Sequence, residues 1–311
     1  METSSPGLST LPRPVAMAVG GGGVFGAAHV GFGYALEERG FIPDRIVGTS
    51  AGAINGAIAA AHPGEAAPWL DRVWTHLRRR EVFPLSYLSS RGSIAANRGL
   101  RRQLARAGLP RRIEKLEIPF AAVATDLSDG TAAVMSTGDL ESALLASSAI
   151  PGVLPPVFRE GRTLIDGGIV AQVPVRAALQ AGAASIVVLL TERENRPLLP
   201  TGPPLRAQAV AFRAALLMMH QQIERDLLDV SRQVPTVVLP TGIAEWPAPW
   251  DFRHSRWMID TASRAAGHFL DELRVSGPGL YRSVGTSEPP AAPRDAAKDA
   301  AETTPALEAG R

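Results

Sequence analysis

Short, wholly apolar segments alternate with longer helical patterns along this chain, and that alternation constrains its fold more than any other feature. The first apolar segment is Val15–Val19, followed by a glycine-rich loop and a helical pattern up to Arg39. A strand that is apolar at every position is buried on both faces, which is typical of a parallel sheet covered by crossover helices. The sequence therefore predicts a three-layer α/β/α fold with a mostly parallel central sheet.

The rest of the chain continues the alternation. Asp129 and Gly130 form a favoured hairpin turn, so one antiparallel pair of strands is expected. We expect strands at Val15–Val19, Arg45–Thr49, Pro119–Thr125, Thr131–Ser136, Thr163–Ile165, Ile186–Leu190 and Thr236–Leu239. We expect helices at Gly26–Arg39, Ala51–Ala61, Pro68–Arg80, Ile94–Ala107, Leu140–Ser148, Val173–Gln180, Leu205–Arg232 and Arg253–Arg274.

The two ends of the chain lack this pattern. Residues 1–13 are rich in Ser, Thr, Pro and Gly, and residues 283–311 are rich in Ala, Pro and charged side chains. Such segments bury too little apolar surface to offset the entropy lost on ordering. We therefore expect a disordered start, one folded domain over residues 14–282, and a disordered tail.

Composition excludes several kinds of site. None of the 311 residues is a cysteine, which excludes disulfides, thiolate zinc sites and a cysteine nucleophile. The formal net charge is only +2, and the arginines form short clusters rather than a dense basic stripe. Nucleic acid is therefore not an expected partner. The sequence predicts neither a metal nor a cofactor.

One uncharged segment, Pro14–Leu36, is long enough to cross a membrane. Seven of the fourteen residues from Gly20 to Gly33 are glycine, which disfavours a transmembrane helix and favours a strand, loop and helix. The start of the chain also lacks the basic region of a signal peptide. We expect a cytoplasmic protein that contacts membranes only at their surface.

The sharpest motif is Gly48-Thr49-Ser50-Ala51-Gly52, between a short strand and a helix. This is the context of a nucleophile elbow, in which a strained turn exposes a serine hydroxyl at the end of the sheet. The free N–H groups of the new helix then face developing negative charge. The alternative is a plain turn in which Ser50 caps the helix.

The loop Gly20–Gly26 allows two interpretations. Its successive backbone N–H groups can stabilise the oxyanion of acyl transfer, where one donor contributes roughly 3 kcal/mol. The spacing Gly21-x-Gly23-x-x-Gly26 also matches the dinucleotide fingerprint. That fingerprint requires an acidic residue at the end of the second strand, and here that strand ends in Thr49 and Ser50. The oxyanion interpretation is therefore favoured, and an oxidoreductase remains the weaker alternative.

The third motif is Asp166-Gly167-Gly168, directly after a predicted strand. A carboxylate at a strand end can lie beside the elbow of another strand, although an aspartate in a turn is also common. By chain order, His220, His254 or His268 could complete a Ser–Asp–His triad. These histidines lie in helical patterns, so a triad is the weaker alternative.

Together and in this order, the three motifs resemble those of the bacterial patatin-like phospholipases, which are serine lipid acyl hydrolases with a Ser–Asp dyad. Ser148-Ala149-Ile150-Pro151-Gly152 and Ala124-Thr125-Asp126-Leu127 also match, and the resemblance covers about residues 15–275. The resemblance implies a patatin-like fold, Ser50 as nucleophile and Asp166 as base. It further implies an oxyanion hole at Gly21, Gly22 and Gly23, with motif glycines at Gly26, Gly48, Gly52, Gly167 and Gly168.

The chain departs from the family pattern at Phe25, where bacterial members commonly carry a basic residue, and at Ala171-Gln172, where relatives often carry asparagines. The expected substrate is a lipid or another acyl ester. An adaptor protein without catalysis on the same fold is the alternative. The helix Ala51–Ala61 and the segment Leu205–Met219 either wall an acyl groove or form core, and Val82–Ser90 is a candidate lid.

A free aspartate has a pKa near 3.9, which burial among apolar neighbours would raise. A dyad without imidazole is therefore expected to work into mildly acidic pH. A single transition near pH 6.5 would instead indicate a histidine base.

Overall fold

The computed structural model describes residues 6–77, 97–191, 207–244, 246–247 and 251–283. Its centre is a nine-stranded sheet whose hydrogen-bonded neighbours follow the order β5-β6-β3-β2-β1-β7-β8-β9, with β4 paired to β3 beside this path. The strands are β1 (Val15–Val19), β2 (Arg45–Thr49), β3 (Phe120–Asp126), β4 (Ala132–Met135), β5 (Val157–Arg159), β6 (Arg162–Asp166), β7 (Ser185–Leu189), β8 (Pro235–Leu239) and β9 (Gly279–Tyr281).

The pairs from β3 through β2, β1, β7 and β8 to β9 are parallel, whereas β4, β5 and β6 form antiparallel pairs. This confirms the mostly parallel sheet and its one expected hairpin, β3–β4. Strands β5 and β9 were not expected. Both are short and only half-buried, so they lack the apolar runs that mark the central strands.

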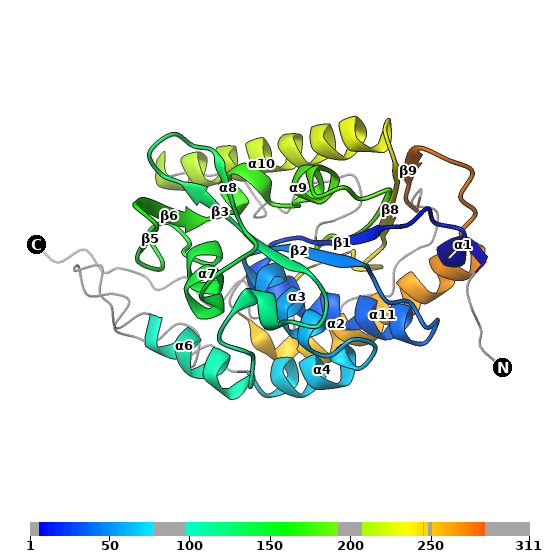
Figure 1. Cartoon of the computed structure of the whole chain (residues 1–311), viewed down its shortest axis with the longest axis horizontal. Coiled ribbons are helices and arrows are strands. Elements are labelled where there is room, and N and C mark those ends of the chain that lie inside the picture. The colour runs from blue at the N-terminus through cyan, green and yellow to red at the C-terminus, as the bar shows by residue number, and fades with distance from the viewer. Residues whose placement is uncertain (1–5, 78–96, 192–206, 245, 248–250, 284–311) are drawn as a thin grey trace, which may run out of the picture.

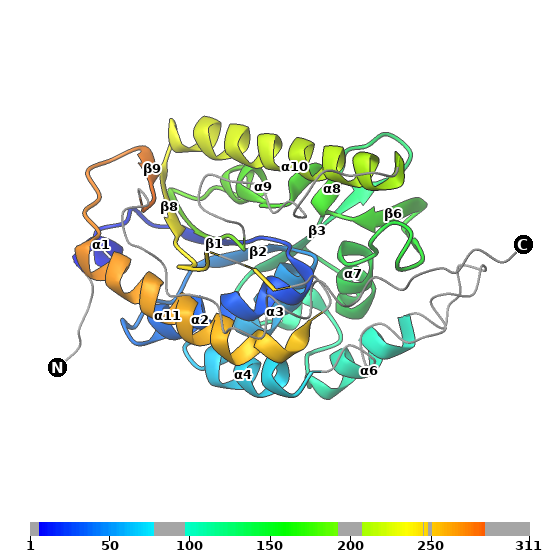
Figure 2. The ribbon, with the colours of Figure 1, turned by 180° about the vertical axis from the view of Figure 1, so that it is seen from behind.

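Helices cover both faces of the sheet (Figure 1). They are α1 (Pro6–Ser9), α2 (Ala27–Glu37), α3 (Ala51–Ala61), α4 (Ala66–His76), α6 (Asn97–Arg106), α7 (Leu140–Ser147), α8 (Gly168–Ala171), α9 (Val175–Gln180), α10 (Ala207–Ser231) and α11 (Ser255–Glu272). Short 3-10 turns lie at η1 (Gly23–Gly26), η3 (Ile113–Lys115) and η4 (Phe252–His254). Helices α8, α9 and α10 lie on one face, and α2, α3, α4 and α11 lie on the other. Figure 2 shows α11 running beside α2.

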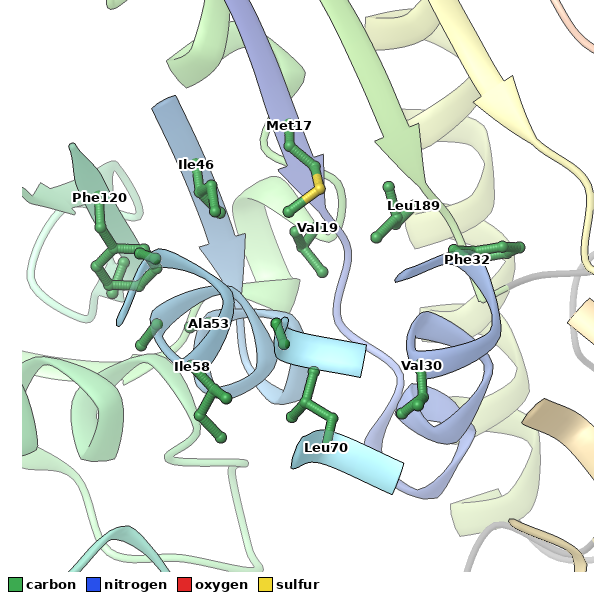
Figure 3. Packing of buried hydrophobic residues seen from close by; sticks show 14 of the residues in the cluster. Met17, Val19, Val30, Phe32, Ile46, Ala53, Ile58, Leu70, Phe120 and Leu189 are labelled. Atoms are coloured by element: carbon green, nitrogen blue, oxygen red, sulfur yellow. The ribbon is translucent and has the colours of Figure 1, made fainter. Parts of the chain in front are cut away.

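Two cores result from the alternation of side chains along each strand. In β1, Val15, Met17 and Val19 face one core, while Ala16 and Ala18 face the other. Figure 3 shows the first core, where side chains of the central strands meet those of α2, α3 and α4. In the second core, α9 packs against β1, β2 and β7. Burial on both faces explains why these strands are apolar throughout.

The start of the chain corrects one expectation. Residues 6–13 are not disordered: α1 is followed by a turn and bends, and Leu8 and Leu11 are buried. Helix α1 packs against α11, and this contact supplies the apolar burial that the composition alone did not predict. The tail expected to be disordered lies outside the described residues, apart from Ser283.

Helix boundaries differ from those expected by a few residues. The helix expected from Gly26 starts at Ala27 because Gly23–Gly26 forms a 3-10 turn. The helix expected at Val173–Gln180 starts at Val175, and the one-turn helix α8 before it was not expected. No helix of the described residues is long and apolar enough to cross a membrane.

Candidate active site

Ser50 occupies a strained turn between β2 and α3. Its backbone angles are φ 54° and ψ −125°, and its exposed fraction is 6%. A positive φ is uncommon for a residue other than glycine, and such strain persists only where surrounding structure enforces it. This is the geometry expected of a nucleophile elbow, and it excludes the plain helix cap because Ser50 makes no side-chain capping bond.

The glycines on either side of Ser50 permit a close approach of backbone segments. A Cβ on Gly48 would meet the Gly52 carbonyl oxygen at 2.5 Å. A Cβ on Gly52 would meet the carbonyl oxygens of Gly20 and Val19 at 2.3 Å each. Because these neighbours are backbone atoms, they cannot move aside easily. The two glycines therefore seat the start of α3 against the end of β1.

Asp166 lies at the end of β6 and faces the elbow. The Ser50 hydroxyl donates to Asp166 Oδ2 over 2.7 Å, and the N–H of Gly168 donates to Asp166 Oδ1 over 2.7 Å. The Thr125 hydroxyl donates to the Asp166 carbonyl over 2.8 Å. One carboxylate oxygen is thus held by the Gly168 N–H, while the other accepts from the Ser50 hydroxyl.

Burial raises the pKa of Asp166 from its usual value to about 6. The hydrogen bonds from Ser50 and Gly168 act in the opposite direction, because they stabilise the carboxylate, but they do not outweigh desolvation. A carboxylate with this pKa is a much better general base near neutral pH than a free aspartate.

Ser147 forms hydrogen bonds with the backbone at both Ser50 and Gly167, and no sequence motif pointed to it. The N–H of Ser50 donates to Ser147 Oγ over 2.9 Å, and Ser147 Oγ donates to the Val123 carbonyl over 2.6 Å. The N–H of Gly167 donates to the Ser147 carbonyl over 3.3 Å. Ser147 is fully buried at the end of α7.

The expected oxyanion hole is only partly available, because one of its three backbone N–H groups already has a partner. The N–H of Gly21 already donates to the Gln172 carbonyl over 2.8 Å, so it is not free to bind an oxyanion. Within the described part of the chain, the N–H groups of Gly22 and Gly23 have no such partner. The loop shape requires glycine here: a Cβ on Gly22 would meet Thr191 Oγ1 at 2.1 Å, and Gly23 has φ +56°.

Comparison with known proteins places this site in a family. The family model described as patatin-like phospholipase matches residues 17–179, which include Ser50, Asp166 and the glycine loop. The chain belongs to the patatin-like phospholipase family.

Relatives in this family include proteins much longer than this chain. An uncharacterized NTE family protein of Mycobacterium bovis is 36% identical over 225 residues, covering 71% of this chain and 61% of that protein. Mouse patatin-like phospholipase domain-containing protein 6 is 30% identical over 183 residues, covering 56% of this chain and 13% of that protein. The chain thus spans less than two thirds of the length of these relatives. Among solved structures, the chain is similar to VipD of Legionella pneumophila. The match covers 84% of this chain and 67% of the VipD chain, with 13% identity and a TM-score of 0.45.

Phe25, which departs from the usual family pattern, is buried beneath an aromatic neighbour. Its ring lies edge-on to Trp246, with ring centroids 4.7 Å apart and an interplanar angle of 64°. The other departure, Gln172, supplies the carbonyl that engages Gly21. Both positions therefore have structural roles beside the glycine loop.

No histidine joins the candidate dyad among the described residues. His254 pairs with Asp251, and His268 with Glu272, while His220 is buried within α10. The dinucleotide alternative also lacks its acidic residue, because the structure places Thr49 and Ser50 at the end of β2. The described residues contain no group of three or more His, Asp or Glu side chains that could hold a metal ion.

Other sequence expectations have mixed outcomes. Most of α3 is buried, whereas Met218 on α10 is 72% exposed and therefore neither core nor the wall of a closed groove. Asp126 orders its own loop, because its Oδ1 accepts hydrogen bonds from the N–H and the hydroxyl of Ser128. The candidate lid Val82–Ser90 lies outside the described residues.

Proposed function

We propose that this protein is a serine hydrolase that cleaves carboxylic esters of lipids, with Ser50 as nucleophile and Asp166 as general base. The observation that carries the proposal is the 2.7 Å hydrogen bond from Ser50, held at positive φ, to the buried Asp166 carboxylate. Membership of the patatin-like phospholipase family supports lipid hydrolysis as the general class of reaction. Phospholipid, lysophospholipid and acylglycerol esters share the carbonyl that this pair would attack.

The reaction has two steps. In the first, Ser50 Oγ attacks the ester carbonyl carbon while its proton moves to Asp166 Oδ2. The tetrahedral intermediate then collapses, and the departing alcohol takes that proton. In the second step, water attacks the acyl-enzyme and gives a proton to Asp166. The bond to Ser50 Oγ then breaks, Asp166 returns the proton to Ser50 Oγ, and the fatty acid leaves.

The oxyanion of each tetrahedral intermediate needs hydrogen-bond donors. Gly22 and Gly23 supply two uncommitted N–H groups beside the elbow, since the loop packs directly against the start of α3. The first-turn N–H groups of α3 add positive potential at the same place. This assignment keeps two of the three glycines expected from the sequence.

The face beside the site favours a lipid surface as the source of substrate. Ile169, next to Gly168, is 48% exposed. On α10, which packs against α8, Val210, Leu217 and Met218 are also exposed, whereas acidic residues occur only in the second half of that helix. We propose that this face contacts the membrane surface from which the ester is drawn.

Covalent labelling with a fluorophosphonate tests the dyad. We expect the label on Ser50, located by peptide mass spectrometry, and its loss in Ser50→Ala. Labelling should be much slower in Asp166→Asn, since the base is missing. Folded wild-type protein that takes no label would contradict the proposal and favour an adaptor role.

A further inference from the structure

A buried asparagine ties the glycine loop to the helix that carries the nucleophile. Asn55 lies in the second turn of α3 and is 3% exposed. Its Nδ2 donates to the Gly26 carbonyl over 2.9 Å and lies 3.2 Å from His29 Nδ1, while its Oδ1 accepts from Trp74 Nε1 over 3.0 Å. Three segments therefore meet at one side-chain amide.

The donors and acceptors of this network are consistent in one arrangement. An indole N–H only donates, so the amide oxygen of Asn55 must face Trp74 and its NH₂ must face Gly26. His29 Nδ1 then accepts, and the ring proton is on Nε2. Burial lowers the pKa of His29 to about 3, so the ring is neutral at physiological pH, as this arrangement requires.

The same contact seats the far end of the loop. A Cβ on Gly26 would meet the Trp74 ring at 2.9 Å and the Ala51 Cβ at 3.2 Å, and Ala51 directly follows Ser50. The near end of the loop is tied down separately, because the Gly20 N–H donates to the Leu189 carbonyl over 2.9 Å. Gly22 and Gly23 lie between these two anchors.

We propose that Asn55 is a positioning residue for the oxyanion loop. By holding the Gly26 carbonyl, it fixes the distance between the free N–H groups of Gly22 and Gly23 and the ester carbon that Ser50 attacks. Oxyanion stabilisation depends steeply on that distance, and a misplacement of about 1 Å can cost roughly 100-fold in rate. The inference depends on the proposed esterase function.

The test compares Asn55→Leu with wild-type protein on a soluble short-chain p-nitrophenyl ester. We expect kcat to fall by roughly 10- to 100-fold while KM changes less than about threefold, because donor alignment matters most in the transition state. The fluorophosphonate labelling rate should fall in parallel. The pH midpoint should not move, since Asp166 and its partners are untouched.

Two further variants keep the test decisive. Trp74→Phe removes the donor that orients Asn55, so it should lower kcat in the same way if Asn55→Leu does not fold. Ser185→Ala is the matched control. Ser185 is the buried first residue of β7, and its hydroxyl donates to the Pro12 carbonyl. Removing that hydrogen bond should leave kcat unchanged.

Unchanged kcat in folded Asn55→Leu or Trp74→Phe, or an equal loss in Ser185→Ala, would overturn the positioning role alone. Absence of Ser50-dependent hydrolysis in the wild type would overturn the proposed function and this inference with it.

Discussion

Ser50 meets Asp166 because β2 and β6 lie end to end along the same side of β3. Thr49 is opposite Val123, and Asp166 is opposite the next residue, Ala124. Strand β4 pairs with Ala122 to Thr125 of β3, a stretch that includes both Val123 and Ala124. It therefore occupies the other side of β3, and β2 and β6 share the remaining side. The hydrogen bond between residues 116 positions apart is therefore set by backbone pairing rather than by flexible loops.

Replacement of Asp166, the proposed base, should abolish most turnover. We expect Asp166→Asn to lower kcat by roughly 100- to 10,000-fold, the usual range for a missing general base. Asp126→Asn is the matched control, because Asp126 is an equally buried carboxylate one strand away that bonds to Ser128 instead of Ser50. Steady-state kinetics on a soluble ester measures both variants. A comparable loss in the two would show that Asp166 has no special role.

The activity should rise with pH through a midpoint near 6. Asp166 must be ionised to accept the serine proton, and burial places its pKa at about 6. This changes the expectation from sequence, because a transition near pH 6 no longer distinguishes an aspartate base from a histidine base. The pH profile of kcat/KM checks the midpoint, and a midpoint near 4 would mean that Asp166 is better solvated than the structure shows.

The same burial should make the active site a source of instability. A carboxyl whose pKa is raised in the folded state binds its proton more tightly there, so its stabilising contribution is present at low pH and is lost as pH rises through about 6. Asp166→Asn should therefore be more stable than wild type at pH 8, by up to about 3 kcal/mol.

Denaturant unfolding at two pH values measures this difference. The gain should shrink at pH 4, where Asp166 is protonated in the folded protein. A gain independent of pH would mean that the variant stabilises the fold by packing instead of by removing a buried charge.

Local motifs revealed the parts of this site that depend on nearby residues. Gly48 and Gly52 flank Ser50 because the turn itself requires close backbone approach, and that requirement is visible in the sequence. The uninterrupted apolar run of β1 predicted burial on both faces for the same reason. Strand and helix types followed from such patterns, and most boundaries agreed within a few residues.

Long-range hydrogen bonds could not be predicted in this way. Ser147 and Asn55 are ordinary helix residues by sequence, and only the fold places one beside Ser50 and the other beside Gly26. The engagement of Gly21 with the Gln172 carbonyl likewise depends on where α8 ends. The pairing of β6 with the C-terminal residues of β3 brings Asp166 to the elbow, and local patterns did not reveal this pairing either.

The proposed contact of α10 with a membrane surface predicts a difference between two kinds of substrate. Met218→Asp should reduce hydrolysis of phospholipid vesicles by roughly tenfold or more, because insertion of one large apolar side chain contributes about 1.5 kcal/mol or more. Hydrolysis of a soluble short-chain ester should not change. Arg225→Asp, on the exposed charged part of α10, is the control. Leu227→Asp is unsuitable, because Leu227 is fully buried and its replacement would unfold the protein. Equal losses on both substrates in Met218→Asp would contradict a surface role.

The elbow glycines should tolerate no side chain, in contrast to a helix glycine that has space for a Cβ. Gly52→Ala would place a Cβ 2.3 Å from two backbone oxygens, so it should destabilise the fold by about 2 kcal/mol or more and displace Ser50. Gly267→Ala, in the middle of α11, meets nothing nearer than the flexible Arg39 side chain at 3.5 Å and should stabilise by up to about 1 kcal/mol through helix propensity. Unfolding curves and fluorophosphonate labelling of the two variants measure stability and elbow geometry separately. If Gly52→Ala kept wild-type labelling, the close approach of α3 to the end of β1 would not be needed to hold the nucleophile.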